Sequence, residues 1–415
     1  MEKEKISELR GLMKTRLNRP MRYYLDLCTR CGLCYDTCHV YQGIPKKEYS
    51  PVGRSEVVRR LFKKHFRLSG RLFPYWGDAA ALDDAVMDDV YEAAFSCTGC
   101  RRCMVHCPFG IDIPHILSMA KLMLIGNGTA PEELVMLADM AVEKGESVEV
   151  FRDGFKENIR NLEKDVQQRL GLASSEGLIP MEKKGANILY VGLSGAHSIV
   201  HPAVIFNRAG ENWTLSFFEG VNFGAFAGDP VKMDLIAKRI INEATELGVK
   251  EVVMVECGTA YRILKFLTGE HPFRVSSIVE VIHRYISEGK IKVRGGAISE
   301  PLTYHDPCQL GRNGGIFDEP REILAILALD YREMSPTREY NWCCGGGGGL
   351  VALDNEQFRI KSGKIKKDQI AATGAKIVVS ACENCITQLG TIQTGYGLDV
   401  QVRSLTELVS ENLDI

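Results

Sequence analysis

Hydrophobic positions in the first 180 residues recur with the spacing of amphipathic helices. In residues 54–71, RSEVVRRLFKKHFRLSGR, apolar side chains return about every 3.6 residues between basic ones, which predicts a basic amphipathic helix. Its basic side is interpreted either as a solvated face or as a docking face for an acidic redox partner or anionic lipid. Residues 4–17 also predict a polar helix, interpreted as a partner arm or a frayed end.

Helical patterning continues from residue 111 to about 185. The segment PEELVMLADMAVEKGES begins with Pro131, a residue that suits the first turn of a helix. The periodicity is then lost in residues 170–187, LGLASSEGLIPMEKKGAN. We therefore expect a domain boundary near residue 180.

From residue 186 the pattern changes to short β-rich runs that alternate with amphipathic helices. Candidate strands lie at 187–193, 251–256, 301–306 and 376–381. Strands that alternate with helices are typical of α/β layering.

The C-terminal half also contains an internal repeat. Residues 246–260 align with residues 372–385 after one insertion, so that Cys257 stands opposite Cys382 and Ala260 opposite Cys385.

Residues 221–228 likewise align with residues 340–347, which places Gly224 and Ala225 against Cys343 and Cys344. Upstream, Leu193 or Ser194 stands where the second copy has Cys308. We predict a helical domain over 1–180, a module with an emptied site over 181–295 and an intact module over 296–415.

The charge balance excludes some classes of partner. Lys and Arg number 51 and Asp and Glu 53, which gives a net charge of -2 and no overall field that would gather nucleic acid. The sequence shows no signal-peptide pattern, and no apolar run approaches the roughly 18 residues that span a bilayer. We expect a cytoplasmic protein with no transmembrane segment of its own.

Fourteen cysteines point to metal or redox chemistry, because the cytosol keeps thiols reduced. Eight precede residue 110, five lie between Cys308 and Cys385, and Cys257 stands alone. A buried relic thiol is the plainest interpretation of Cys257, with a redox or partner role as the alternative.

Two ferredoxin-type runs account for the first eight cysteines. Each has the spacing C-x2-C-x2-C-x3-C, in which three thiolates hold one [4Fe-4S] cube and the fourth holds the other. The first predicted ligand set is Cys28, Cys31, Cys34 and Cys107; the second is Cys97, Cys100, Cys103 and Cys38.

Zinc is the alternative for these runs, but it prefers two separated cysteine pairs in tetrahedral geometry. His39 and His106 are interpreted as polar neighbours, because each cube is already fully supplied.

Residues 341–350, NWCCGGGGGL, set two adjacent cysteines against five glycines. The predicted third ligand set is Cys308, Cys343, Cys344, Cys382 and Cys385. Five thiols exceed the corners of one cubane, so a cluster that used all of them would need shared or bridging thiolates and an unusual geometry.

Glycines next to such a cluster let the backbone approach it, adopt positive φ and aim N–H groups at sulfur. Gly345, Gly346 and Gly347 are therefore predicted to line the cofactor. A phosphate loop is disfavoured, because no Lys-Ser or Lys-Thr follows the glycines. His305 and Asp306 are interpreted either as proton carriers or as caps of the strand end.

The arrangement Cys…Cys-Cys-Gly…Cys-x2-Cys behind two ferredoxin runs resembles heterodisulfide reductases. It is similar to the D subunit of these enzymes, or to their B and C subunits joined, and the intact module resembles their CCG (cysteine-rich) domain. The resemblance implies a helical bacterial-type 2x[4Fe-4S] ferredoxin domain followed by two pseudo-symmetric α/β CCG modules. It also implies that the five C-terminal cysteines hold a non-cubane [4Fe-4S] cluster.

This resemblance extends to relatives with a single CCG site. They include the K subunit of the sulfite-reductase-linked menaquinol complex and the D subunit of class II benzoyl-CoA reductase complexes. Family members with two intact CCG motifs hold two such clusters, whereas this chain has the cysteines for one. The resemblance thus implies a place in anaerobic metabolism, within a larger redox complex.

Two functional hypotheses follow from the resemblance. In the first, the chain is an oxidoreductase subunit whose CCG cluster does thiol or disulfide chemistry. In the second, it only wires electrons between an HdrA-like flavoprotein, or a membrane cytochrome linked to quinol, and another enzyme. No Rossmann fingerprint is present, so hydride transfer would belong to a partner.

Overall fold

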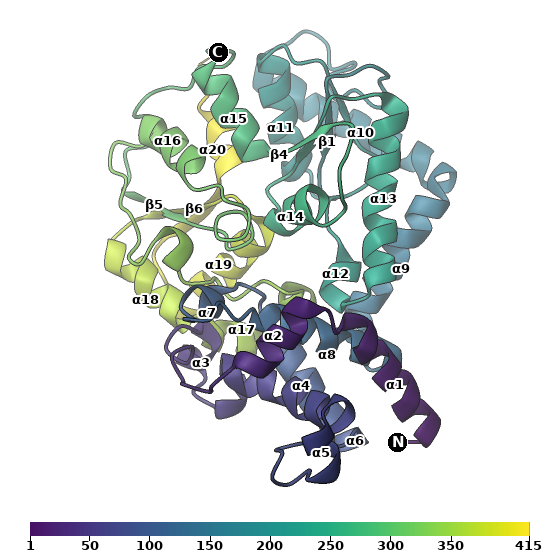
Figure 1. The fold of residues 1–415 in the computed structure, drawn as a ribbon. Helices are drawn as coiled ribbons and strands as arrows, with labels where there is room; N and C mark the ends of the chain where they lie inside the picture. The colour runs from purple at the N-terminus through teal and green to yellow at the C-terminus, as the bar shows by residue number, and fades with distance from the viewer. Residues whose placement is uncertain (415) are drawn as a thin grey trace.

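The computed structural model describes residues 1–414, in which a helical domain carries two α/β modules (Figure 1). The helical domain and the N-terminus occupy the lower part of the view, and the modules with the C-terminus lie above them. The fold class expected from the sequence is confirmed: helices come first, followed by small parallel sheets with helices around them.

The helical domain is built around α8 (Ile113–Asn127), which packs against four other helices. Short polar side chains begin several of its helices, since Asn18, Asp83 and Asp112 each accept a hydrogen bond from a backbone N–H of the first turn. The other helices are α1 (Lys3–Arg16), α2 (Arg19–Leu27), α3 (His39–Gly43), α4 (Pro51–Phe66), α5 (Leu68–Leu72), α6 (Asp84–Phe95) and α7 (Arg102–Val105). The next two helices, α9 (Glu132–Glu146) and α10 (Val148–Leu170), lie beside the first module (Figure 1), where α9 packs on α12 (Phe223–Ala227) and α13 (Pro230–Leu247) and α10 packs on α11 (His197–Arg208).

Two interpretations of this domain are corrected. The N-terminal helix is not a frayed end, because Leu9 and Met13 of α1 are fully buried and α1 packs on α8. The single helix expected over 54–71 is wrong in its bounds, since α4 ends at Phe66 and Arg67 is extended before α5. Gly70 lets α5 fold back on α4, because a Cβ there would lie 2.3 Å from the Lys63 carbonyl oxygen.

The first module contains a parallel sheet with strand order β2-β1-β3-β4. Its strands are β1 (Ile188–Val191), β2 (Trp213–Leu215), β3 (Glu251–Met254) and β4 (Arg274–Ser277). Its helices are α11 (His197–Arg208), α12 (Phe223–Ala227), α13 (Pro230–Leu247), α14 (Gly258–Phe266) and α15 (Ile278–Ser287).

The second module repeats this plan with strand order β5-β6-β7. Its strands are β5 (Leu302–His305), β6 (Ile377–Ser380) and β7 (Gln401–Ser404). Its helices are α16 (Asp318–Leu327), α17 (Glu356–Ser362), α18 (Lys364–Thr373), α19 (Glu383–Tyr396) and α20 (Leu405–Glu411), with 3-10 turns at Arg338–Tyr340 (η2) and Leu350–Ala352 (η3).

The two sheets correspond strand by strand. The order β1-β3-β4 matches β5-β6-β7, and all the pairings are parallel. Where β2 pairs with β1 in the first module, the second has two isolated parallel bridges, Ile298 with Ala328 and Leu302 with Tyr331. One hydrophobic core runs through both modules, with α11 packed on α20 and α15 on α16.

Each module places a glycine against the helical domain: Gly228 of the first lies against Lys121, and Gly347 of the second lies against Thr98. In the second module, α17 and α18 also pack on α3. The second cysteine loop of the helical domain lies at this junction, where α7 contacts η2.

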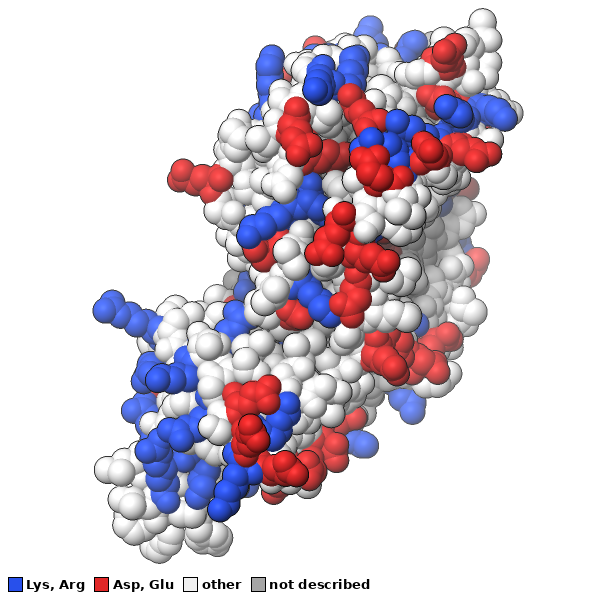
Figure 2. Space-filling view, turned by 90° about the vertical axis from the view of Figure 1, so that its right-hand side faces the viewer, with Lys and Arg blue, Asp and Glu red and all other residues white. Residues whose placement is uncertain are grey.

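The surface of the helical domain is uneven in charge. Figure 2 shows Lys and Arg gathered near the lower end of the molecule, next to an uncharged tip. None of the helices within residues 1–414 combines the length and the apolar run needed to cross a bilayer.

Candidate metal centres

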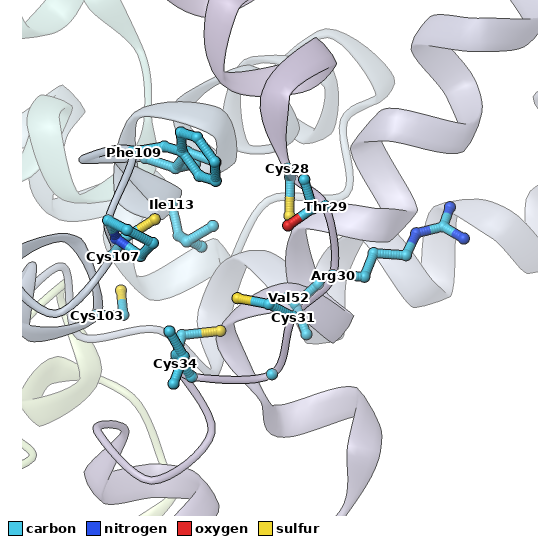
Figure 3. A pocket seen from close by; sticks show the side chains of 14 residues that line it. Cys28, Thr29, Arg30, Cys31, Cys34, Val52, Cys103, Cys107, Phe109 and Ile113 are labelled. Atoms are coloured by element: carbon cyan, nitrogen blue, oxygen red, sulfur yellow. The ribbon is translucent and has the colours of Figure 1, made fainter.

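The first ferredoxin run forms a pocket together with the end of the second. Cys28, Cys31 and Cys34 follow α2, Cys107 follows α7, and all four line one pocket. Their sulfur atoms point toward a common space, with Phe109, Ile113 and Val52 around it (Figure 3). The structure therefore brings together the four cysteines of the first predicted set, and it places Cys103 in the same lining.

The two ferredoxin runs share a backbone conformation that lets each loop turn tightly around its cysteines. In each run the residues two and four positions after the first cysteine have positive φ: Arg30 and Gly32 in one, Gly99 and Arg101 in the other. Because positive φ is unfavourable for arginine, each of these two is held by carboxylates. Arg30 pairs with Glu56 and Asp78, and Arg101 with Asp112 at 2.8 Å.

The second predicted set lies around a buried arginine. Arg54, which is 2% exposed, donates to the Sγ of Cys38 at 3.5 Å and twice to Ser96 at 2.8 Å. Burial lowers the pKa of Arg54, but the neighbouring Cys38 and Cys97 outweigh it and raise that pKa above its ordinary value. Burial raises the pKa of the Cys97 thiol to about 11, against the lowering effect of Arg54.

Cys100 points from the second run toward the C-terminal module. Its Sγ, the Sγ of Cys343 and a ring nitrogen of His39 lie within 4.8 Å of one another. A hydrogen bond with Cys343, followed by burial, raises the pKa of Cys100 to about 11. The second ferredoxin run and the C-terminal cysteines are thus contiguous.

The five C-terminal cysteines come from three loops and are all buried. Cys308 follows β5, Cys343 and Cys344 lie between η2 and η3, and Cys382 and Cys385 follow β6. The Sγ atoms of Cys344 and Cys385 are 3.3 Å apart. Hydrogen bonds with Cys343 and Cys385 hold the pKa of Cys344 well below its usual range.

The glycine run serves both the cysteines and the domain junction. The N–H groups of Gly345 and Gly346 donate to the Sγ atoms of Cys343 and Cys344, each at 3.4 Å. Gly345 has φ of 101°, which a side chain would disfavour. A Cβ on Gly347 would lie 2.5 Å from the Thr98 carbonyl oxygen, so the run also allows close approach to the second ferredoxin loop.

A buried lysine beside the five cysteines was not predicted from the sequence. Lys366 of α18 is 0% exposed, and its Nζ donates to Asn341 Oδ1 at 2.8 Å and to Gln369 Oε1. Burial lowers the pKa of Lys366 to about 7, although the neighbouring Cys344 raises it. Lys366 lies in a basic helical run, KIKKDQ, and its sequence carries no signal that would separate it from surface lysines.

The two residues before Cys308 have different environments. His305 is fully buried, with a ring nitrogen within 4.8 Å of the Sγ atoms of Cys344 and Cys385. Asp306 is held by both guanidinium nitrogens of Arg321 at 2.8 Å and by the Arg338 N–H. Asp306 therefore organises the strand end, in keeping with its interpretation as a cap.

His39, His106 and Cys257 lie in three different environments. His39 is 2% exposed, and its Nε2 has no hydrogen-bond partner within residues 1–414. His106 packs edge-on against Tyr340. Cys257 is buried at the start of α14, where burial raises its thiol pKa to about 12, and Cys382 is the nearest thiol to influence it.

Two family models match this chain. Residues 24–111 match the 4Fe-4S dicluster domain and residues 302–390 match the cysteine-rich domain, CCG.

Three relatives show the range of similar proteins. The chain is 26% identical over 398 residues to an Hdr-like menaquinol oxidoreductase iron-sulfur subunit of Archaeoglobus profundus, covering 83% of this chain and 70% of the relative. It is 26% identical over 401 residues to the D subunit of the dihydromethanophenazine:CoB–CoM heterodisulfide reductase of Methanosarcina mazei, covering 94% of each. The chain is thus similar to iron–sulfur subunits of heterodisulfide reductases and of Hdr-like oxidoreductases, and it contains a 4Fe-4S dicluster domain and a CCG domain. It is also 26% identical over 409 residues to an EtfAB:quinone oxidoreductase of Syntrophomonas wolfei, covering 88% of this chain and 54% of that protein.

The residues present fit iron–sulfur clusters. Thiols gather in groups, and all five of the C-terminal group are buried; backbone N–H groups point at two of the sulfur atoms, and Arg54 lies against a third. Such donors stabilise thiolates that ligate iron and tune the potential of a bound cluster. This heterodisulfide reductase-like chain therefore carries iron–sulfur sites in both the helical domain and the CCG module.

Proposed function

We propose that this chain is an iron–sulfur electron-transfer subunit of a multi-subunit redox complex. Two cubane clusters in the helical domain would lie in line with a third, non-cubane cluster in the CCG module. The observation that carries the proposal is the contact between Cys100 and Cys343, whose Sγ atoms lie within 4.8 Å. Sites whose ligands touch are close enough to exchange single electrons.

The proposed ligands follow the spacing of the cysteines and their positions. One cubane site takes the lining of the first pocket, and the other takes the thiols around Arg54. The sets are Cys28, Cys31, Cys34 and Cys107; Cys97, Cys100, Cys103 and Cys38; and Cys308, Cys343, Cys344, Cys382 and Cys385. Gly345, Gly346 and Gly347 wrap the third site.

When bound, these clusters supply single-electron transfer and, at the CCG site, a sulfur-rich centre for thiol or disulfide chemistry. The chain's own residues prepare that site. The Gly345 and Gly346 N–H groups and the buried Lys366 stabilise negative charge on sulfur, and the closely packed walls exclude water. His305 is the buried group within reach of Cys344 and Cys385.

The alternative is a wiring subunit without chemistry at the CCG site. It would connect an HdrA-like flavoprotein to another enzyme, such as a class II benzoyl-CoA reductase, or accept electrons from a quinol-linked membrane partner. The observation that favours it is that a single module carries a complete set of CCG cysteines. The relatives named for menaquinol and quinone favour the membrane-linked form, with this chain peripheral at the membrane through its partner.

Activity of the isolated holoprotein separates the two functions. We expect protein prepared without oxygen to reduce a low-molecular-weight disulfide with a reduced viologen as donor. Cys343→Ala should abolish this turnover and leave the cubane electron paramagnetic resonance signals intact. Turnover that survives Cys343→Ala would remove the catalytic proposal, and a wild-type protein that accepts electrons without turnover would establish the wiring function.

A further inference from the structure

A cavity of about 410 Å³ lies between the helical domain and the first module. Its walls come from α8, α12 and α14 and from the loop Cys97–Gly99, and Gln309 and Gly348 of the second module complete them. Gly224 and Ala225 line it, at the positions where the repeat places Cys343 and Cys344 in the intact module. The cavity thus lies at the loop that aligns with the Cys343–Cys344 loop, whereas the other aligned positions, Cys257, Ala260 and Leu193 or Ser194, do not line it.

Basic side chains dominate the lining of this cavity. They are Arg16, Arg101, His115, Lys121 and Arg262, against a single acidic residue, Asp229. Asp229 is already engaged as the N-cap of α13, because its Oδ1 accepts from the N–H groups of Val231 and Lys232. Asp112 neutralises only Arg101. The cavity therefore retains positive charge.

Two of the arginines have no partner within residues 1–414. Neither Arg16 nor Arg262 donates a side-chain hydrogen bond or forms a salt bridge in that range, and Arg262 Nε is buried without any acceptor. Burial, followed by repulsion from Arg101, lowers the pKa of Arg262 to about 10. Removing a guanidinium from water without an acceptor is unfavourable, whereas an oxyanion would satisfy its fork of N–H donors.

We propose that this cavity binds a small organic oxyanion, carrying phosphate or carboxylate groups that Arg262 and Arg16 recognise. Its volume suits a metabolite-sized ligand. Because Cys97, Thr98 and Gly99 form one wall, the ligand would lie beside the second ferredoxin loop. The loop at residues 340–347 would then contact a cluster in one module, and the aligned loop at residues 221–228 would contact an anion in the other.

Titration calorimetry of the anaerobic holoprotein tests the proposal, with pyrophosphate and citrate as probes for the phosphate and carboxylate forms. We expect at least one probe to bind with a dissociation constant below about 1 mM, and Arg262→Gln to weaken it at least tenfold. Arg160→Gln is the matched control, because Arg160 is an exposed arginine on α10 without a partner in residues 1–414.

Arg16→Gln provides a second variant if Arg262→Gln loses iron or unfolds, and it should also weaken binding. The proposal is overturned if neither probe binds the wild type, or if both cavity variants bind as tightly as the Arg160 control. Neither readout depends on disulfide reduction, so this result is independent of the function proposed above.

The tip of the helical domain, residues 68–76, exposes large apolar side chains. Five large apolar side chains between residues 68 and 76 are from 62% to 93% exposed: Leu68, Leu72, Phe73, Tyr75 and Trp76. Basic residues of α4 and α5 lie beside them, namely Arg60, Lys63, Lys64, Arg67 and Arg71. Figure 2 shows this combination at the lower end of the molecule, where an uncharged tip borders blue side chains.

We infer that this tip docks on an anionic lipid surface. Exposed Trp and Tyr favour the headgroup region of a bilayer, and nearby Lys and Arg are attracted to anionic lipid. Nearby carboxylates neutralise part of the basic group, since Asp26 pairs with Arg67 and Asp78 with Arg60. Lys63, Lys64 and Arg71 form no salt bridge within residues 1–414 and so stay available to lipid.

Vesicle co-sedimentation tests this surface. We expect the holoprotein to sediment with phosphatidylcholine vesicles that contain phosphatidylserine, and to be released by high salt. The double substitution Tyr75→Ser and Trp76→Ser should reduce the bound fraction at least fivefold, whereas Leu329→Ser, at a 72% exposed leucine elsewhere, should not. Absence of binding, or binding that the double substitution leaves unchanged, overturns the inference and favours an acidic protein as the occupant.

Discussion

The two α/β modules share one scaffold and each places an aligned glycine against the helical domain, but only one presents a full set of thiols. Gly228 and Gly347 occupy aligned positions, and each lies against the helical domain. A Cβ would lie 2.2 Å from Lys121 Cβ at Gly228 and 2.5 Å from the Thr98 oxygen at Gly347. Lys121 Nζ donates to both loops, at 2.6 Å to Phe226 O and 3.1 Å to Gly348 O.

The other residues of the two aligned loops, 221–228 and 340–347, differ in chemistry. In the first module the loop forms α12, and Phe226 and Ala227 join the hydrophobic core of the helical domain. In the second module the corresponding loop presents Cys343 and Cys344 with N–H groups directed at their sulfur atoms. Docking depends on small residues common to both modules, whereas ligation depends on thiols from three loops, which only the second module supplies.

Removing one thiol from each module in turn gives the largest expected effect, a difference in iron content between the two variants. We expect the anaerobic wild type to contain about 12 iron atoms per chain, and Cys343→Ala to contain about 8, because the CCG cluster loses a central ligand. Iron and acid-labile sulfide analysis measures this directly.

Cys257→Ala is the matched control in the first module. It should leave the iron content at the wild-type value, because Cys257 is outside the proposed ligand set and packs among apolar residues, although its thiol lies near Cys382. A loss of four iron atoms from Cys257→Ala would show that the first module takes part in ligation. A wild-type value near 8 would show that the CCG site holds no four-iron cluster.

Gly347, the glycine of the second module that lies against the helical domain, gives the next largest effect, a loss of stability when it is substituted. Gly347→Ala places a methyl group 2.5 Å from the Thr98 carbonyl oxygen, so either the loop or the helical domain must shift. We expect a destabilisation of about 2 kcal/mol, in the range of overpacked sites. The apparent thermal midpoint and the rate of limited proteolysis at the junction measure it.

Gly390→Ala in α19 is the control for that substitution. Nothing lies within 4 Å of a Cβ at Gly390, and alanine is favoured over glycine inside a helix. This variant should be as stable as the wild type or slightly more stable. If Gly347→Ala behaves like Gly390→Ala, the glycine run is not needed for close approach of the domains.

The sequence predicted the parts of this molecule that repeat a fixed spacing. Both ferredoxin runs, the CCG pattern and the four apolar strands β1, β3, β5 and β6 follow from local patterns, and the structure has those strands. The strand β2 was missed because it has only three residues, and β4 (RVSS) and β7 (QVRS) were missed because they are polar. Their pairing partners, which are distant in sequence, make them strands.

The charged residues at the sites could not be predicted for a related reason. Arg54, Lys366 and Arg262 each lie in helices whose sequences resemble ordinary basic amphipathic surfaces. Their burial results from contacts with residues distant in sequence, such as Ser96 for Arg54 and Asn341 for Lys366, and no local pattern records it. The chemistry that surrounds the thiols therefore emerges only when these distant segments come together.

The buried carboxyl group of Glu256, at the boundary between the modules, gives the smallest expected effect, a change of stability with pH. Glu256 is 3% exposed and accepts hydrogen bonds from Ser404 Oγ at 2.5 Å and Thr406 N at 2.9 Å, whereas the aligned residue of the second module is Ala381. Burial raises the pKa of Glu256 to about 7, although the Ser404 hydrogen bond lowers it.

Because the folded-state pKa lies above the unfolded one, folding favours the protonated form, and stability falls as the pH rises toward and past 7. We expect Glu256 to remove about 1 kcal/mol of stability between pH 6 and pH 8. Glu256→Gln, which cannot ionise, should show a smaller drop in the apparent thermal midpoint over that interval. Equal drops in both proteins would mean that Glu256 is already ionised at pH 6 in the folded state and that the contact between the modules does not desolvate it.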